Sequence, residues 1–472
     1  MAARMNRLSY SRLDLRSMPK RTQGLAPFSL SVLVVNLGTI PLLLAVGVGP
    51  LTYYALFAMY LLTLGFWLIQ GDVTEDFLAL SVMFVAFYVL LPEPMLSEAQ
   101  YYFWNAPSEF NNPNGSVLLM CGVFLATATF PTLWRARMPR EFAALPVVRL
   151  RVPVLGLVAL GLIAFAALFP SILLQTRAEV RTQVGQEGGA LRQLLLVTAP
   201  RGLAGGYLIA LAISACGRIA RHKALPLSEM MLALPGVAFF NPVAISRQLL
   251  LTGFLAVIFI LSRFRIFDRK WILVCLPLVS LVIAPAISNI TRYEARNDVF
   301  PFAPDFDVHQ NIALAMQLVE LEGHRFGLHL LASLSTVLPS ELKIFQAEHL
   351  LASGRLKAIY SQTNISLPIF VEFFVDFGWI GVVIMTYALF AALRRLQERV
   401  YYHAPSLWLL GVSAIVSANW LSLNRGPFLG NSPVLIFFIL GWTVCVLGLR
   451  LKVPLSKAAE RYSRHLIERR TG

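Results

Sequence analysis

Charged residues are scarce in this chain, and acidic residues are scarcer than basic ones. Only 14% of the 472 residues are Asp, Glu, Lys or Arg, against about a quarter in an ordinary soluble domain. With 57% hydrophobic residues and a mean hydropathy of +0.67, the composition excludes a soluble globular protein. The apolar runs repeatedly reach the roughly 20 residues that a helix needs to cross a bilayer. The sequence therefore predicts a polytopic, all-α membrane protein.

Cysteine is also rare, and its placement excludes two kinds of site. The four cysteines all fall inside apolar runs, where cysteine acts as a small buried apolar side chain. The sequence therefore predicts neither a disulfide framework nor a thiolate metal site, and we expect no cofactor. The residues are Cys121, Cys216, Cys275 and Cys445.

The positive charge is distributed unevenly between the two sides of the predicted spans. Of the 40 Lys and Arg residues, 28 fall in the segments on the side of the two termini. The positive-inside rule places that side in the cytoplasm. The net charge of +15 thus indicates topology and contact with anionic lipid head groups, and we expect no nucleic-acid partner. About twelve spans are predicted, at 27–47, 50–70, 76–92, 115–134, 152–174, 195–217, 224–240, 245–262, 271–287, 365–391, 404–423 and 432–449.

This topology divides the chain into five parts, with both termini in the cytoplasm and a large, partly helical loop between spans nine and ten on the outer side. In a Gram-negative cell the membrane is the bacterial inner membrane and the loop lies in the periplasm. The parts are a basic tail at 1–26, spans one to nine at 27–287, the large loop at 288–364, spans ten to twelve at 365–449, and a second basic tail at 450–472.

The large loop at 288–364 gathers the ionisable groups of an otherwise apolar chain. It holds 8 of the 25 acidic residues and four of the seven histidines. Its segment Phe326 to Leu338 is too short to span a bilayer, so we expect it to be re-entrant or interfacial. If the protein does chemistry, this loop is where the groups for it lie.

Arginines stand at the outer mouths of the predicted spans, in five separate segments of the chain, one of which contributes Arg201 at the start of span six. Of 12 outward basic residues, only Lys343 and Lys357 are lysine. An arginine at this depth can extend to a lipid phosphate, or it can face an aqueous cavity. Guanidinium groups suit bidentate binding of phosphate, so their number favours a phosphate-binding cavity. The candidates are Arg177, Arg247, Arg292, Arg296 and Arg425.

An anionic ligand on the outer side is best explained as a phosphorylated lipid, because nucleotides and nucleotide sugars are cytoplasmic. A polyprenyl-diphosphate-linked saccharide carries a good leaving group, and arginines would stabilise the charge that develops on it. Glycosyl transfer also needs a base near the acceptor hydroxyl. Candidates are Asp305, Asp307 and His309, at the start of an amphipathic stretch at 311–321. Asp307 is also a candidate helix N-cap.

The Asp305-Phe306-Asp307 triplet resembles the metal-binding carboxylates of nucleotide-sugar glycosyltransferases. No glycine-rich phosphate loop or Rossmann unit accompanies it, so we reject that interpretation. His324 and His329 are five residues apart and do not face each other on one helix as a metal-binding pair would. No metal is therefore expected.

An ordered set of segments resembles the oligosaccharide repeat-unit polymerases (Wzy), GT-C-like membrane glycosyltransferases related to the O-antigen ligases. The first segments are FDVHQNIALAMQL and GHRFGLHLLASLSTVLPSELKIF, whose Leu338-Pro339-Ser340 matches a family turn. TNISLPIFVEFFVDFGWIG follows. The family's Arg-x10-Gly pattern is met by Arg177 and Gly188, and no such pair starts from an arginine of the large loop. Arg247 in NPVAISR and Arg425 in LNRGPF match family arginines at span mouths.

The resemblance implies a metal-independent transfer of a growing glycan from undecaprenyl diphosphate to the non-reducing end of a lipid-linked repeat unit. It also implies membrane lipids and a chain-length regulator protein as partners. The resemblance assigns Arg292, with His309 or Asp307 near the acceptor, to catalysis. Binding of the diphosphate and framing of the cavity are assigned to Arg177, Arg247, Arg296 and Arg425.

Glu372 and Asp376 lie four residues apart on one face of span ten. They could counter the arginines, line the saccharide path, or pair with a neighbouring helix. The sequence leaves these three roles open.

Three other functions remain open at this point. A ligase would transfer the finished glycan to lipid A core. A transporter or flippase for lipid-linked sugars should carry internal repeats and charges through the midplane, and the sequence shows neither. An assembly protein without chemistry would not need arginines from five segments.

Overall fold

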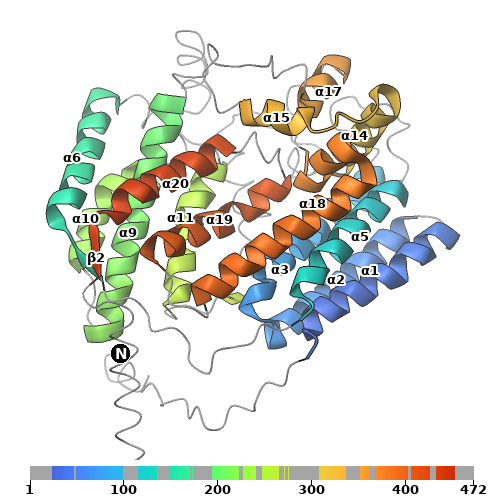
Figure 1. Cartoon of the computed structure of the whole chain (residues 1–472), viewed down its shortest axis with the longest axis horizontal. Coiled ribbons are helices and arrows are strands. Elements are labelled where there is room, and N and C mark those ends of the chain that lie inside the picture. The colour runs from blue at the N-terminus through green and yellow to red at the C-terminus, as the bar shows by residue number, and fades with distance from the viewer. Residues whose placement is uncertain are drawn as a thin grey trace, which may run out of the picture.

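The computed structural model contains long, closely packed helices at the positions of the predicted spans (Figure 1). A helix stands at each predicted span except the ninth, 271–287, most of which lies outside the described residues. The structure describes residues 24–46, 49–98, 115–134, 148–170, 173, 194–222, 227–240, 247–264, 270–271, 275, 308–335, 351–360, 367–401, 406–425 and 432–451.

The first helix group lies at the right of Figure 1 and is built mainly from the N-terminal quarter of the chain. Within it α1 packs against α2 and α5. The short element η3 is a π-helix that joins α3 to α4. The elements are α1 (Pro27–Val46), α2 (Pro50–Gln70), η2 (Val73–Glu75), α3 (Asp76–Phe84), η3 (Val85–Leu90), α4 (Pro92–Glu98), α5 (Gly115–Thr129) and η6 (Phe130–Thr132).

The second helix group lies at the left of Figure 1, and its longest helix, α9, packs against α20, α10 and α11. Two three-residue strands pair antiparallel beside it, with Arg149 opposite Arg450. The elements are β1 (Val148–Leu150), α6 (Val152–Leu168), η7 (Leu194–Thr198), α9 (Ala199–His222), α10 (Leu227–Ala238), α11 (Arg247–Arg263), α20 (Ser432–Val446) and β2 (Leu449–Leu451).

The remaining helices join the two groups and cover one end of the first. The helix α19 packs against α11 and α20 of the second group, against α3 of the first group, and against α18. Helix α18 packs on α5, and three short loop helices lie near its first turns (Figure 1). The bounds are α14 (Val308–Glu322), α15 (Leu328–Ser335), α17 (Ala352–Tyr360), α18 (Ile369–Tyr401) and α19 (Leu407–Arg425).

Close approach of α9 and α20 depends on small residues, as is common where membrane helices pack. A Cβ atom on Gly206 would lie 2.4 Å from the backbone of Gly441, and one on Gly441 would lie 2.3 Å from the carbonyl oxygen of Gly202. Any side chain at these positions would force the two backbones apart. The GLAGG run within α9 therefore sets the contact between these helices.

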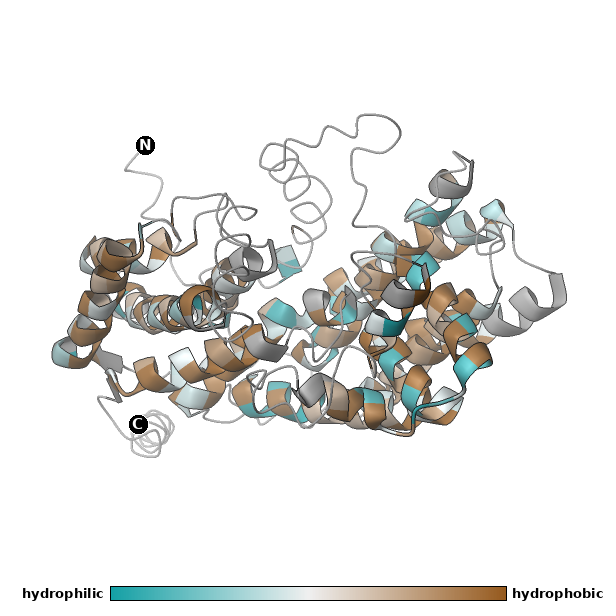
Figure 2. Cartoon of the chain, turned by 90° about the horizontal axis from the view of Figure 1, so that it is seen from above, coloured by the Kyte–Doolittle hydropathy of each residue, from teal (hydrophilic) through white to brown (hydrophobic). Residues whose placement is uncertain are grey.

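Five helical stretches are long and apolar enough to cross a membrane, and hydrophobic residues line the helices of both groups (Figure 2). The protein is therefore a helical, membrane-embedded protein. The number of twelve spans, their orientation and the periplasmic position of the large loop remain predictions. The five stretches are Pro50–Gln70, Val73–Met95, Gly115–Thr132, Leu196–Ile219 and Ile369–Tyr401.

The predicted burial of the cysteines is confirmed for Cys121, Cys216 and Cys445, which are buried and free. Cys275 is exposed, so the prediction was wrong there. An apolar run predicts that a residue lies in a span but not that it is buried, because apolar residues occupy both the positions that face lipid and those that face the bundle.

Candidate functional site

The structure places only part of the predicted site. Arg177, Arg292, Arg296, Asp305 and Asp307 lie outside the described residues. Arg247 is the first residue of α11 and Arg425 is the last residue of α19, with their side chains not described. Among the predicted site residues, His309 alone is described with its side chain.

The backbone nevertheless brings Arg247 and Arg425 to the same end of two packed helices. The Thr252 hydroxyl of α11 donates a 2.8 Å hydrogen bond to Oδ1 of Asn419 in α19. Arg247 precedes Thr252 by five residues and Arg425 follows Asn419 by six. Since the helices run antiparallel and rise about 1.5 Å per residue, the two arginines lie about 7.5 Å and 9 Å beyond this bond in one direction.

This end of the bundle is also the end where α18 begins. At the opposite end, Nε and Nη2 of Arg263, the last residue of α11, both donate to the carbonyl oxygen of Val400, near the end of α18. The same Arg263 and the first half of α19 line one small cavity. The starts of α11 and α18 and the end of α19 therefore share the other end.

A buried polar group accompanies the arginine at the end of α19. Asn424 is fully buried, and its Nδ2 donates to the carbonyl oxygen of Trp420 at 2.9 Å. Its Oδ1 has no hydrogen-bond partner among the described residues. A buried amide oxygen of this kind is uncommon and marks this end of the bundle as polar.

His309 lies in the first turn of α14, on the face that packs against the membrane helices. Residues 308–315 of α14 are all buried, so its first two turns are enclosed on every side, whereas the amphipathic pattern predicts burial of one face only. The His309 Nε2 atom is 2.8 Å from the Tyr53 hydroxyl of α2, and Nδ1 is 3.2 Å from Oε2 of Glu93 in α4. All three side chains are buried. Both ring nitrogens therefore face groups of the protein itself.

The large loop is hydrogen-bonded to α18 at a break in that helix. Gly378 has φ +64° and ψ −155° inside the helix, which leaves preceding carbonyl groups without their helical partners. The carbonyl oxygens of Val375 and Asp376 accept hydrogen bonds from the backbone N–H groups of Arg325 and Phe326, at 3.0 and 2.8 Å. Nδ1 of His324 lies 3.2 Å from the carbonyl oxygen of Phe374. The bonds lost at the break are thus replaced by the loop.

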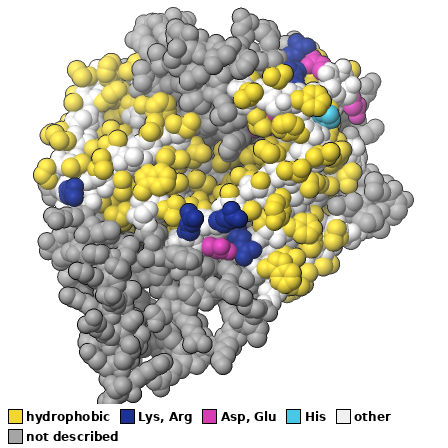
Figure 3. All heavy atoms as spheres, in the orientation of Figure 1, with side chains coloured by type: hydrophobic (Ala, Val, Ile, Leu, Met, Phe, Trp, Pro, Cys, Tyr) yellow, Lys and Arg dark blue, Asp and Glu magenta, His cyan; other side chains and the backbone are white. Residues whose placement is uncertain are grey.

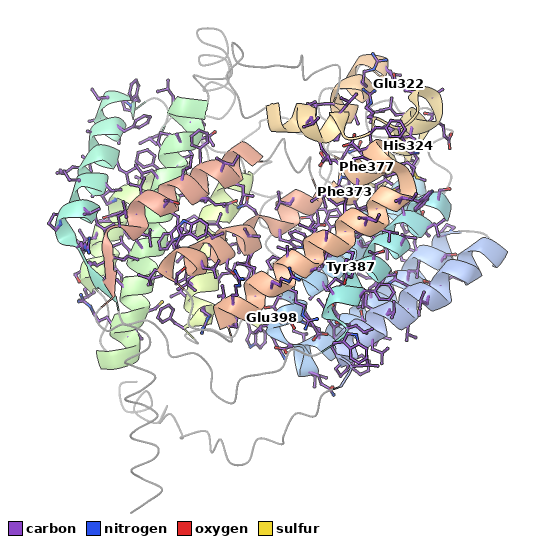
Figure 4. The ribbon with its side chains drawn as sticks, in the orientation of Figure 1. Glu322, His324, Phe373, Phe377, Tyr387 and Glu398 are labelled. Carbon is purple, nitrogen blue, oxygen red and sulfur yellow. The ribbon has the colours of Figure 1, made fainter. Side chains whose placement is uncertain are left out.

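Glycine is required at this break for two reasons. A positive φ is strained for any residue with a side chain. A Cβ atom on Gly378 would also lie 2.9 Å from Nε2 of His324. In Figure 4, His324 and Phe377 lie together at the upper end of α18.

The two carboxylates of α18 hold α15 rather than a described arginine. Oδ1 and Oδ2 of Asp376 accept from the backbone N–H groups of His329 and Leu330, at 3.0 and 2.9 Å. These are N–H groups at the positive end of α15. Oε1 of Glu372 lies 3.4 Å from Nε2 of His329. Of the three roles that the sequence left open, contact with a neighbouring helix is the one seen among the described residues.

The environment of His329 also fixes its tautomer. Nδ1 of His329 accepts a 3.1 Å hydrogen bond from the backbone N–H of Ala352, at the start of α17. The ring proton of a neutral imidazole must then be on Nε2, which faces Glu372. One side chain thereby connects α15, α17 and α18.

Charged side chains of the loop gather on its outer surface. Glu322 at the end of α14 forms ion pairs with Arg325 and with Arg355 of α17. The hydrogen bond from Arg355 lowers the pKa of the Glu322 carboxyl. These arginines face an acidic partner at the surface, away from the buried His309.

Comparison with protein-family models, curated proteins and solved structures finds no match. The likeness to repeat-unit polymerases therefore stays a prediction from sequence. Within the described ranges, no three His, Cys, Asp or Glu side chains gather where they could hold a metal ion.

Tyr53 and Glu93 were not predicted as site residues. Tyr53 stands among other aromatic residues near a span end, where an interfacial position is equally expected. Glu93 carried one usable signal, an acidic residue at the outer end of an apolar run. The partner that it contacts lies more than 200 residues away in the chain, and periodicity does not reveal such a pairing.

The burial of His309 predicts a dependence of stability on pH. Burial lowers the pKa of His309 from 6.5 to about 3, so the folded protein keeps this imidazole neutral while the unfolded chain protonates it below about pH 6.5. The contribution of His309 to stability should fall as the pH drops from about 6.5 toward 3, by about 2 kcal/mol at pH 5. Because the buried carboxyl of Glu93 beside it is also ionisable, this loss is measured by unfolding Glu93→Leu in mixed micelles from about pH 8 to 5. A variant with both His309→Leu and Glu93→Leu should lose most of it, and an unchanged pH dependence would contradict the assignment.

Proposed function

We propose that this protein is a membrane glycosyltransferase that polymerises lipid-linked oligosaccharide repeat units at the outer face of the bacterial inner membrane. The observation that carries the proposal is the convergence of Arg247 and Arg425 at the end of the bundle where the loop helices dock. These two arginines come from segments that are 178 residues apart in the chain. A shared anionic ligand explains why both stand there.

The proposed reaction breaks the bond between the anomeric carbon of the growing glycan and its diphosphate. A hydroxyl oxygen of the incoming repeat unit forms the new bond to that carbon, and the diphosphate leaves with the electron pair. Arg247 and Arg425 stabilise the charge on the leaving diphosphate, together with the predicted arginines of the other outer segments. The acceptor's proton passes to a base.

In the proposed reaction, His309 positions the first turn of α14 rather than acting as the base. Its two ring nitrogens face Tyr53 and Glu93, and its side chain is buried. Docking of His309 holds the first turn of α14 against the bundle, and α14 begins at Val308, the residue after Asp307. Asp307 is therefore the stronger candidate for the base.

Arginine variants test the proposal in cells. Arg247→Ala and Arg425→Ala should each reduce the formation of long-chain glycan by about 100-fold, since each removes a donor to the developing charge. Arg247→Lys should recover only part of the activity, because an ammonium group cannot form the bidentate contact. The readout is the ladder of chain lengths on a gel.

The matched control is Arg395→Ala, an exposed arginine of α18 near its opposite end. It should leave the ladder unchanged. All variants are checked for their amount in the membrane. Normal ladders from both Arg247→Ala and Arg425→Ala at normal protein levels would overturn the proposal.

A further inference from the structure

The turn between α14 and α15 holds a large apolar side chain outward in a strained backbone. Phe326 has φ +50° and is the one residue other than glycine with a positive φ among the described residues. Its side chain is 80% exposed. A bulky residue in this conformation is uncommon and persists only where the surrounding structure enforces it.

The enforcement comes from the break in α18. The N–H groups of Arg325 and Phe326 are bonded to α18 carbonyl oxygens, and a Cβ atom on Gly327 would touch the Phe377 ring at 3.3 Å. The backbone of the turn is therefore fixed on α18, with the Phe326 side chain exposed. The exposed position of the phenyl ring therefore follows from a turn whose backbone is hydrogen-bonded to α18.

The surroundings of Phe326 are apolar and exposed on the side of α18. Leu328 and Leu331 of α15 are exposed, as are Trp379 and Ile380 just beyond the break. The charged group of Glu322, Arg325 and Arg355 adjoins the turn. On the face shown in Figure 3, charged side chains lie at the upper right and in a lower row, with hydrophobic side chains between them.

The length of α18 places this turn at the boundary of the hydrocarbon layer. The stretch Phe377 to Leu393 carries no charged residue, and its 17 residues rise about 25 Å. A bilayer has about 30 Å of hydrocarbon, so the layer must reach beyond Phe377 if the charged residues from Arg394 onward remain outside it. Phe326 is bonded to the residue before Phe377. In Figure 4, Glu322 and Glu398 mark the two charged ends, with Phe373, Phe377 and Tyr387 between them.

We propose that the turn 323–327 is an interfacial anchor whose Phe326 ring inserts among the upper acyl chains of the surrounding lipid leaflet. The apolar face of α15 continues this contact, and Glu322, Arg325 and Arg355 lie at the level of the head groups. The anchor fixes the docked loop relative to the membrane surface. This inference depends on the membrane embedding of α18 and not on the proposed transferase activity.

Spin labels test the depth of the turn. In a Cys275→Ser background, whose other cysteines are buried, a nitroxide is attached to Phe326→Cys in liposomes of phosphatidylethanolamine and phosphatidylglycerol. Ile384→Cys on the exposed face of α18 is the lipid control, and Glu320→Cys on the exposed face of α14 is the aqueous control. The label at 326 should collide more with oxygen than with a water-soluble nickel complex, as at 384. The label at 320 should show the reverse.

Two results would overturn the proposal. A label at 326 that is as accessible to nickel as the label at 320 would place Phe326 in water. A label shielded from both reagents would mean that protein covers it, either a partner or a second copy. The unmodified protein gives an independent measurement: a phospholipid with a diazirine in its upper acyl chain should crosslink to the peptide that contains Phe326, and absence of that crosslink contradicts the anchor.

Discussion

Glu93→Ala is expected to lower the free energy of unfolding by about 3 kcal/mol. Glu93 is buried, and its Oε2 lies 3.2 Å from Nδ1 of His309. Alanine would leave Nδ1 of the buried imidazole without the carboxylate oxygen that it faces and would remove this side-chain contact between α4 and α14. Unfolding by sodium dodecyl sulfate in mixed micelles, followed by circular dichroism, measures the loss.

A double substitution separates the structural role of this pair from a chemical one. Replacing both members, by Glu93→Leu and His309→Leu in a Tyr53→Phe background that leaves no buried hydroxyl without its partner, removes the polar groups together and should restore most of the stability lost in the single variant. If His309 only positions α14, the double variant should also keep most of its polymerising activity. A stable double variant without activity would instead make His309 a catalytic residue. Stability as low as in Glu93→Ala would contradict the pairing.

Asp376→Ala is expected to loosen the docking of the loop by about 3 kcal/mol. The Asp376 carboxylate is fully buried and accepts from two backbone N–H groups at the start of α15. Alanine leaves both donors buried without a partner, at a cost of about 1 to 3 kcal/mol each. Because the loop then opens more often, limited proteolysis should cut between α14 and α18 much faster than in the unchanged protein.

The control for this prediction is Glu320→Ala, which changes an exposed carboxylate of α14 and should leave the cleavage rate unchanged. Asp376→Asn keeps one acceptor oxygen, so its cleavage rate should lie between those of Asp376→Ala and Glu320→Ala. Equal cleavage rates of Asp376→Ala and the unchanged protein would show that the hydrogen bonds from α15 to the Asp376 carboxylate do not hold the loop. The membrane helices serve as an internal reference, since their cleavage should not change.

The helices were largely predictable from the sequence, because hydropathy alone identifies stretches that avoid water. The predicted span at 50–70 coincides with α2 (Pro50–Gln70), and the amphipathic stretch at 311–321 falls within α14 (Val308–Glu322). The predicted and observed ends differ where a helix continues beyond the apolar region. The tenth span was predicted at 365–391, whereas α18 extends to Tyr401 through residues that are charged and still helical.

The contacts of the candidate site could not be predicted in the same way. The docking of His309 on Tyr53 and Glu93 joins three segments far apart in the chain, and local patterns carry no record of such pairings. The break at Gly378 is also invisible to periodicity, because one glycine within an apolar helix is ordinary. The arginines were recognisable by their positions at span mouths, and the structure adds a shared end for Arg247 and Arg425.

The most direct test of the proposed function uses purified protein in lipid nanodiscs. It is incubated with lipid-linked repeat units and without lipid A, and the products are separated by chain length. The proposal predicts lipid-linked chains longer than one repeat unit, made by the unchanged protein and by Arg395→Ala and not by Arg247→Ala. Repeat units that remain single with the unchanged protein, and join only when lipid A is added, would mean a ligase. Repeat units that remain single under every condition would contradict the account.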